Sequence, residues 1–167
     1  MHTQCNCKDY PDLEFKRSDI SKRIKVTPTL KKSLSLVAKL PDNTDLHKLY
    51  ICESCGQQWQ LSRAWNWVNE PYLFRVPSVS AEEWLTLPYV QPDEMLIFIA
   101  VLEGMTPLLR QLQELQCRME PCRNKAIVGS VFCPQHHIES LQAVPSFPAY
   151  PRGRWFPPYE RNGVIPW

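Results

Sequence analysis

The sequence lacks long apolar runs and is poor in glycine, which makes up only 5 of its 167 residues. Its longest apolar run, Met95 to Leu102, is far shorter than the roughly 20 residues that a membrane-spanning helix needs. The first ten residues have neither the basic start nor the apolar stretch of a secretory signal. These features predict a soluble protein that resides in the cytoplasm and has no membrane partner.

Signature motifs of several enzyme classes are also absent. The sequence contains no HExxH, no phosphate-binding glycine loop and no GxSxG. The zinc deaminase pattern is missing because Pro121-Cys122 is not followed by a second cysteine at the required spacing. We therefore expect no catalytic residues, no bound organic cofactor and no enzymatic activity.

Proline and cysteine are the residues that the sequence has in unusual number. Its 16 prolines favour fixed turns and extended segments, while an apolar content of 44% still allows a core. Most of its seven cysteines come in closely spaced pairs, and an odd total cannot pair completely into disulfides. In a reducing cytoplasm such cysteines are expected to bind metal.

Charge is segregated along the chain, although the formal net charge is only +2. Residues 1–40 and 117–167 have an excess of basic groups, whereas residues 41–116 have an excess of acidic groups. Basic ends suit a nucleic acid and an acidic middle suits a basic protein partner. Solvated faces explain the same pattern equally well.

The first half of the chain is expected to be rich in strands. Residues 23–26 fit a short strand that ends before Pro28. Residues 30–40 fit a helical face or an alternating strand, and we favour the helix. Further strands are expected to form a small antiparallel sheet with tryptophans on one face, at residues 48–52, 58–67 and 72–76.

The pattern becomes helical at Ser80, which starts a capping box with Glu83 and a short helix that stops near Pro88. A second helix is expected from Pro92 through the apolar run, buried on all sides and ended by Gly104. A third is expected over residues 106–115, where leucines are spaced for one buried stripe. Beyond Leu141 the chain is rich in proline and aromatic residues, which favours an extended arm that docks on the body or on a partner.

The strongest metal motif is Cys117-x4-Cys122-x10-Cys133-x2-His136. Three cysteines and one histidine suit tetrahedral zinc, and tight turns aim each pair of side chains at one point. Residues 128–132 fit a small hairpin between the pairs, and a short helix follows the last pair. His137 competes with His136 for the fourth position. The segment resembles small zinc fingers of the form C-x3/4-C…G-x-C-x2-H, which implies zinc but no particular function.

A second motif combines Cys5-x-Cys7 with the knuckle Cys52-x2-Cys55-Gly56. In such a knuckle the glycine permits a left-handed turn, and backbone amides point at a thiolate. The two pairs together predict a four-cysteine zinc site that fixes the N-terminus to the sheet. His2 and His47 are alternative donors. Dithiol redox chemistry and an iron–sulfur cluster are the competing interpretations.

The stretch YICESCGQQWQLSRAWNW, followed by SAEEWLTLPYVQPDEM, resembles small bacterial zinc-ribbon proteins of the toxin-immunity type. The resemblance covers residues 48–100 and implies a protein that binds and inhibits another protein. A protein partner is therefore expected. A zinc finger that binds nucleic acid through Arg118, Arg123 and Lys125 is the alternative.

The sequence thus predicts an α+β protein with two structural zinc ions, a zinc-ribbon-like knuckle on a small antiparallel sheet, a helical middle, a zinc finger and an extended tail. The expected ligands are Cys5, Cys7, Cys52, Cys55, Cys117, Cys122, Cys133 and His136. The expected domain organisation is a β-rich part over residues 1–78, a helical part over 79–116, a finger over 117–141 and an arm over 142–167.

Overall fold

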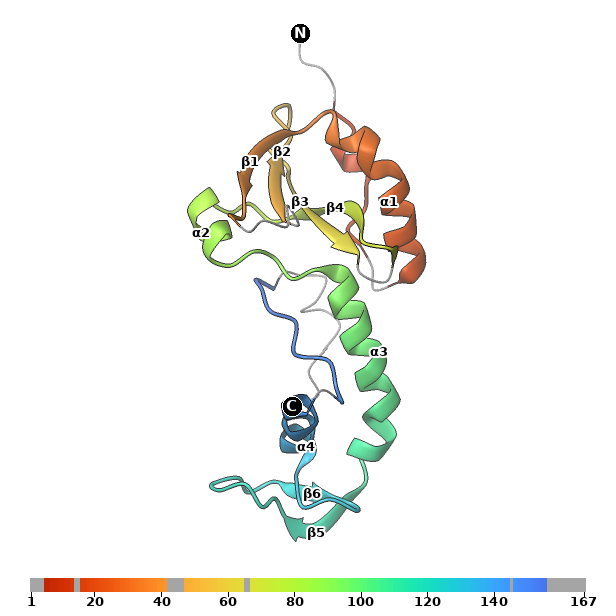
Figure 1. The fold of residues 1–167 in the computed structure, drawn as a ribbon, viewed down its shortest axis with the longest axis vertical. Coiled ribbons are helices and arrows are strands. Elements are labelled where there is room, and N and C mark those ends of the chain that lie inside the picture. Colours follow the sequence, from red (N-terminus) through yellow and green to blue (C-terminus); the bar gives the residue numbers. More distant parts are fainter. Residues whose placement is uncertain (1–4, 14–15, 42–46, 65–66, 145, 156–167) are drawn as a thin grey trace. The chain divides into compact units, whose positions relative to one another are not determined.

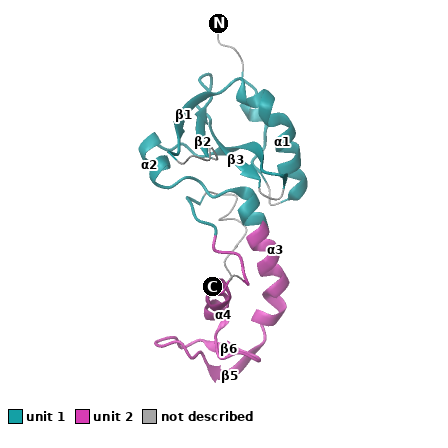
Figure 2. Ribbon diagram, viewed as in Figure 1, with its two compact units in different colours: residues 1–96, 151–164 teal, residues 97–150, 165–167 magenta. Residues whose placement is uncertain are grey.

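The computed structural model describes residues 5–13, 16–41, 47–64, 67–144 and 146–155. The chain divides into two compact units, the first made of residues 1–96 and 151–164 and the second of residues 97–150 and 165–167 (Figure 2). The α+β fold class predicted from the sequence is confirmed, with an antiparallel sheet in each unit. Within the described ranges, no helix has the length and apolar character needed to cross a bilayer.

The first unit is built on a four-stranded antiparallel sheet of strand order β1-β2-β3-β4 (Figure 1). Strands β2, β3 and β4 confirm the three strands that the sequence predicted in this region. In the two inner strands, Tyr50 of β2 pairs with Trp59 of β3. The strand bounds are β1 Ser35–Lys39, β2 Lys48–Ile51, β3 Gln58–Ala64 and β4 Glu70–Val76.

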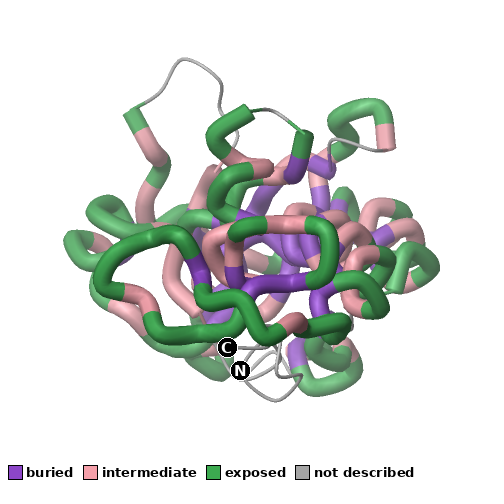
Figure 3. The backbone as a smooth tube through the Cα atoms, turned by 90° about the horizontal axis from the view of Figure 1, so that it is seen from below, coloured by how far each residue is buried: buried purple, intermediate pink, exposed green. Residues whose placement is uncertain are grey.

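Strand β3 is buried on both of its faces, because all of its residues except Arg63 are buried. Figure 3 colours the buried stretches of the backbone purple. On one face Trp59 and Leu61 belong to an apolar cluster that includes Leu30 and Leu73. On the other face Gln60 is fully buried and its amide is satisfied. Gln60 Nε2 donates to the Tyr89 carbonyl at 2.8 Å, and Oε1 accepts from the Tyr89 amide at 2.9 Å. One face of β3 is thus covered by the apolar cluster, and the other is hydrogen-bonded to the segment at Tyr89.

Helix α1 (Arg17–Lys31) replaces the strand predicted at residues 23–26, so that prediction was wrong. Its buried positions are Ile20, Arg23, Thr27 and Leu30, which follow helical spacing but are half polar. The apolar periodicity of the sequence therefore could not reveal it. Thr27 is satisfied, because its Oγ1 donates to the Arg23 carbonyl and accepts from the backbone amide of Leu73 in β4. Arg23 is satisfied in part: its Nη2 donates to the Pro11 carbonyl at 2.8 Å, whereas its Nη1 has no hydrogen-bond partner among the described residues.

The helix favoured over residues 30–40 is also wrong, because α1 ends at Lys31 and β1 begins at Ser35. Pro28 occupies the last turn of α1 and has no amide to continue the hydrogen-bond ladder. Four residues after the helix ends, the chain pairs with β2, with Leu36 opposite Tyr50. Pairing with a distant strand thus decided a segment whose local pattern was ambiguous.

Helix α2 (Ala81–Thr86) confirms the predicted capping box. The Ser80 hydroxyl accepts from the Glu83 amide at 3.2 Å, and the Glu83 carboxylate accepts from the Ser80 amide at 3.2 Å. This start fixes the direction of the helix and places Trp84 in the core, where its indole Nε1 donates to Gln60 at 2.8 Å.

Helix α3 (Pro92–Leu109) begins at the expected proline but runs through Gly104, contrary to the prediction. A glycine ends a helix most readily in the left-handed conformation, and Gly104 does not have a positive φ. The helix is not buried on all sides either, since Ala100 and Leu108 are exposed. The chain passes from the first unit to the second within this helix.

The second unit contains a two-stranded antiparallel sheet of β5 (Leu112–Gln116) and β6 (Lys125–Ile127), followed by helix α4 (Pro134–Ala143). The helix predicted over residues 106–115 is therefore wrong beyond Leu109. Its leucine spacing suited a helix, but pairing of Leu112 with Ile127 gives this segment a strand partner. The small hairpin expected at residues 128–132 forms only as a turn, which the Ile127 amide closes on the Phe132 carbonyl at 2.9 Å, and these residues contain no strand.

The arm after α4 is docked over its described residues, first in the second unit and then in the first. In the second unit the Phe98 ring makes edge contacts with Phe147 at 5.8 Å and with Tyr150 at 5.4 Å between centroids. Trp155, which was also expected to dock, is half-buried. The other three aromatic residues of the arm that were expected to dock, Phe156, Tyr159 and Trp167, lie outside the described residues.

In the first unit the arm forms a parallel bridge between Arg154 and Tyr89. The Val90 amide donates to the Arg154 carbonyl at 3.1 Å, and the Arg154 amide donates to the Pro88 carbonyl at 2.7 Å. Gly153 makes this approach possible. A Cβ added there would lie 2.7 Å from the Val90 nitrogen and 2.8 Å from the Pro88 oxygen.

Gly153→Ala should therefore detach the arm from residues 88–90. Because both clashing atoms are backbone and the φ of +146° is unfavourable for alanine, we expect a loss of about 1–3 kcal/mol in unfolding free energy. Hydrogen exchange of the Val90 amide should accelerate at least about tenfold. Gly104→Ala is the matched control, because its Cβ meets nothing within 4 Å and a helix favours alanine. Unchanged exchange at Val90 in the Gly153 variant would contradict the docking.

Candidate metal centres

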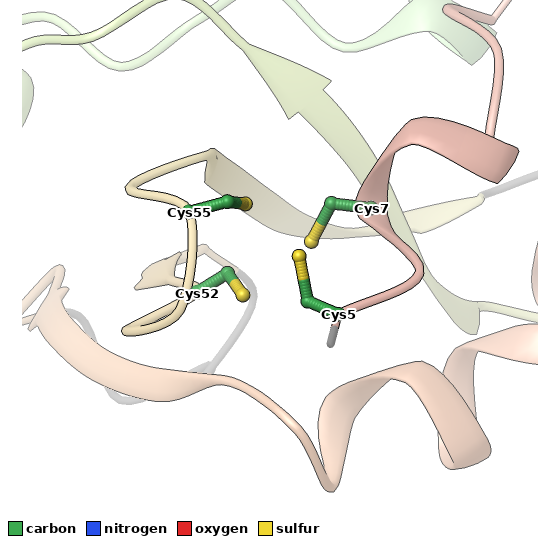
Figure 4. A group of neighbouring side chains, drawn as sticks. All are labelled: Cys5, Cys7, Cys52 and Cys55. Carbon is green, nitrogen blue, oxygen red and sulfur yellow. The ribbon is translucent and has the colours of Figure 1, made fainter. Parts of the chain in front are cut away.

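The first cluster consists of Cys5, Cys7, Cys52 and Cys55, whose sulfur atoms all lie within 4.8 Å of one another. Cys5 precedes and Cys7 begins the short 3-10 helix η1 (Cys7–Asp9), while Cys52 follows β2 and Cys55 lies in the turn before β3. Figure 4 shows the two pairs of side chains facing each other across a common centre. The structure thus brings together the four cysteines that the sequence predicted as one site.

The knuckle that holds Cys52 and Cys55 has a local cause in the sequence. Gly56 has a φ of +74°, a conformation that residues with a side chain adopt with difficulty. Its amide donates to the Cys52 carbonyl at 2.8 Å, and the Cys52 amide donates to the Gln57 carbonyl at 2.9 Å. The turn therefore closes on itself and directs both sulfurs to one side.

The knuckle also stabilises negative charge on one of its sulfurs. Burial tends to raise the pKa of Cys52, but backbone hydrogen bonds at Cys55 and Ser54 outweigh it and lower the pKa to about 7. Across the cluster, burial among neighbouring thiols raises the pKa of Cys7 far above its ordinary value. Without a cation, the four thiols therefore cannot all ionise at neutral pH.

The second cluster consists of Cys117, Cys122, Cys133 and His136, whose donor atoms also lie within 4.8 Å of one another. Cys117 directly follows β5, and Cys122 lies in the loop before β6. Cys133 is the N-cap of α4 and His136 lies in its first turn, as the CxxH spacing predicted.

The distances in the second cluster match tetrahedral zinc. The sulfurs of Cys122 and Cys133 are 3.9 Å apart, and Nδ1 of His136 lies 3.2 Å from Cys117 Sγ and 3.3 Å from Cys133 Sγ. Zinc bonds of about 2.3 Å to sulfur and 2.0 Å to nitrogen, at tetrahedral angles, require separations of about 3.8 and 3.5 Å. The donors are therefore close to the positions that an ion would impose.

Of the two adjacent histidines, the structure places His136 in the cluster. Its Nδ1 faces the sulfurs, and its Nε2 lies 3.8 Å from the carboxylate of Glu139, one turn further along α4. This distance is longer than a hydrogen bond, but it places a carboxylate near the second ring nitrogen, and carboxylates are among the groups that orient metal-bound histidines. His137 Nδ1 instead contacts the Ser130 hydroxyl at 3.3 Å.

The alternative donors considered for the first cluster do not join it within the described residues. His47 Nδ1 contacts the Ser62 hydroxyl at 3.2 Å, on the sheet rather than at the knuckle. His2 lies outside the described residues.

The second cluster also contains one sulfur that ionises easily. Burial tends to raise the pKa of Cys117, but backbone hydrogen bonds at Cys133 and Met119 outweigh it and, with His136, lower the pKa to about 6. Burial raises the pKa of Cys133, its partner across the site. Cys117 therefore ionises more easily than Cys133. A divalent cation bound between them would favour the ionised form of both sulfurs.

All seven cysteines are free thiols, and the two clusters fit two structural zinc sites. Each cluster offers four donors of the types that zinc prefers, which closes the tetrahedron. The dithiol redox interpretation needs a CxxC pair at the start of a helix, whereas Cys52 and Cys55 lie between β2 and β3.

Comparison of the chain with models of known protein families, with curated proteins and with solved structures found no match. The resemblance of residues 48–100 to toxin-immunity proteins therefore has no support beyond its own motif. The function has to be inferred from the clusters and the surface around them.

Acidification should release metal from the first cluster before the second. Binding at the first cluster displaces protons from four thiols, and burial and neighbouring thiols raise the pKa of Cys7 and of Cys55. Binding at the second displaces protons from three thiols, one of which already has a pKa of about 6. Falling pH favours the protonated thiols, so metal affinity should fall more steeply at the first cluster.

The test is a titration from about pH 8 to about pH 4 with a zinc-sensitive dye, performed on Cys55→Ser and on Cys122→Ser. The Cys122 variant, which keeps only the first cluster, should release zinc at a pH at least roughly half a unit higher. Release in the reverse order would show that the thiol environments do not set the affinities.

Proposed function

We propose that this chain is a non-enzymatic protein-interaction module stabilised by two structural zinc ions. Four protein donors at each cluster leave no position for a substrate or a reactive water, which catalytic zinc needs. The clusters also lie in separate compact units, one in each. This distribution suits a role in folding each unit.

The second unit shows why such a fold would need metal. It spans residues 97–150 with 165–167, and domains of this size rarely gain enough stability from an apolar core alone. Its most buried residues include Ala126, Ile127 and Ile138, and Cys133 is itself fully buried among them. A zinc ion would connect β5, the following loop and α4 at one point.

The observation that favours a binding role is a set of exposed residues between positions 115 and 131, which we call the finger face and define as Leu115, Arg118, Met119, Arg123 and Val131. The three apolar side chains are 54%, 46% and 41% exposed, although they lie on the segment that carries the second cluster. The Arg118 amide donates to the Val131 carbonyl at 2.8 Å, which places these two residues side by side. Apolar groups held in water on a rigid scaffold are typical of interaction sites.

The finger face takes the place of the acidic middle of the chain, which would suit a basic protein partner. The acidic residues of 41–116 are divided between the two units, and Asp93 is buried against the Tyr72 hydroxyl. On the finger face, Arg118 and Arg123 make no ion pair with the described residues. We therefore propose a partner that presents apolar and acidic groups.

Two more specific functions, inhibition of a toxin and binding of a nucleic acid, can be compared with this proposal. Inhibition of a toxin would make the chain an immunity protein, and only the motif around Cys52 and Cys55 supports it. Nucleic-acid binding would use Arg118, Arg123 and Lys125, but Lys125 Nζ is paired with the Glu114 carboxylate at 2.8 Å. A protein partner makes better use of the exposed apolar groups.

The proposal predicts that Met119→Glu combined with Val131→Glu abolishes partner capture. The tagged chain should be recovered from its own cells, with the co-purifying proteins quantified by mass spectrometry. Leu85→Glu with Leu87→Glu is the matched control, because these residues are 41% and 45% exposed in the first unit. One protein should co-purify at stoichiometric amounts with the native and control chains, and at least about tenfold less with the finger-face variant.

Zinc content and circular dichroism must be equal in all three proteins, so that lost capture reflects the surface. Capture that survives the finger-face changes would refute the proposed surface. Capture that disappears with nuclease and weakens steeply with salt would favour the nucleic-acid alternative instead.

A further inference from the structure

Most of the positive charge in the first part of the chain lies on and next to helix α1. Residues 16–33 contain seven basic residues, whereas Asp19 is their single acidic residue. One of the seven, Arg23, is buried against the sheet. The remaining charge is on the surface of the first unit, far along the chain from the finger face, and the proposed function makes no use of it.

The helix gathers part of this charge on one exposed face. The buried positions of α1 repeat at helical spacing and face the sheet, where Thr27 accepts from the Leu73 amide of β4. On the opposite side of the helix, five exposed residues follow one another every three or four positions. We call them the basic stripe and define it as Ser18, Lys22, Lys25, Thr29 and Lys32.

The charge of the basic stripe is hardly neutralised by the protein itself. Lys25 and Lys32 form no ion pair with the described residues. Lys22 Nζ lies 3.8 Å from the Asp19 carboxylate, but its side chain is 78% exposed. A pair in water contributes little and exchanges readily for another anion. All three ammonium groups can therefore meet a negatively charged partner.

Arg17 adds positive charge beside the first turn of α1. Its guanidinium lies over the Trp67 ring at 5.1 Å from the centroid, and Trp67 Nε1 donates to the Ser21 hydroxyl at 2.9 Å. An aromatic face orients a guanidinium without removing its charge. These contacts hold the Arg17 charge next to the basic stripe.

The chemistry of the basic stripe distinguishes between two kinds of acidic partner. A protein interface has apolar groups at its centre, and none of the described residues 16–33 is an exposed large apolar residue. The stripe instead offers ammonium groups and the hydroxyls of Ser18 and Thr29. Lysine, serine and threonine side chains are typical contacts of nucleic-acid phosphates. A phosphate backbone therefore fits this face better than a protein does.

The length of the basic stripe supports the same partner. The helical rise separates Ser18 from Lys32 by about 21 Å along the axis of α1. Each strand of a DNA duplex places a phosphate about every 3.4 Å along its axis. A row of phosphates can thus meet several residues of the stripe at once.

We propose that the basic stripe binds the sugar–phosphate backbone of a nucleic acid without reading its base sequence. This function is additional to capture of a protein by the finger face. The two surfaces share no residue and belong to different units, so each can fail its test without affecting the other.

Lys25→Gln combined with Lys32→Gln should weaken this binding by removing two cations from an exposed helix face that glutamine also favours. The probe is a fluorescent DNA duplex of random sequence, and its affinity is measured between about 50 and about 200 mM salt. Each phosphate contact contributes about 0.9 to the fall of log K with log salt, so the native slope should be about −3. In the variant it should be shallower by about 2.

Two control variants remove the same charge elsewhere. Lys39→Gln with Arg110→Gln changes exposed residues outside both surfaces, and Arg118→Gln with Arg123→Gln changes the finger face. Both should keep the native slope, with circular dichroism and zinc content equal in all proteins. A native slope near zero, or an equal loss of slope in either control, would overturn the inference.

Two further measurements use the native chain. Polyglutamate should displace the DNA at least about tenfold less well than unlabelled DNA at equal charge, and equal displacement would point to an acidic protein and overturn the inference. On addition of DNA, the backbone amide signals of residues 18–32 should shift in NMR spectra. Shifts confined to residues 115–131 would assign the nucleic acid to the finger face and also overturn it.

Discussion

The fold depends on the convergence of thiols from distant parts of the chain. In the first cluster, one pair of cysteines comes from the N-terminal segment and the other from a knuckle that begins 45 residues later, yet all four sulfurs lie within 4.8 Å of one another. Ionised thiols at this separation repel, and neutral thiols attract one another only weakly. A divalent cation is the component that turns their proximity into stability.

The first cluster is continuous with the core of its unit. Cys7 and Cys52 are packed in the same apolar cluster as Leu30 of α1 and Trp59 of β3. Metal binding would thus hold the N-terminal segment, the helix and the sheet together. The second cluster has the same effect on a smaller scale, because it links the end of β5 to the first turn of α4. The finger face is exposed on that same scaffold.

Features that neighbouring residues determine were easier to predict from the sequence than features that depend on distant parts of the chain. The capping box at Ser80, the knuckle at Gly56 and the CxxH pair on α4 depend on neighbouring residues, and all were found. Helix α1 was missed because Arg23 and Thr27 occupy its buried face, where apolar periodicity gives no signal. Strand β5 was missed because its partner β6 decides its conformation.

The candidate site shows the same limit. The second cluster could be predicted because its ligands lie within twenty residues, and the first because two separate pairs suggested a single ion. The place of Glu139 beside His136 could not be assigned from the sequence, because a carboxylate one turn after a histidine is a weak signal. The apolar cluster that Trp59 shares with Cys7 and Leu30 could not be assigned either, because it exists only once α1 and the sheet have packed.

The central claim is that both clusters hold structural zinc, and native mass spectrometry with elemental analysis tests it most directly. Protein purified without added metal should contain two zinc ions per chain, and Cys55→Ser and Cys122→Ser should each contain one. Chains without metal, chains with disulfides among these cysteines, or iron with inorganic sulfide in place of zinc would contradict the account.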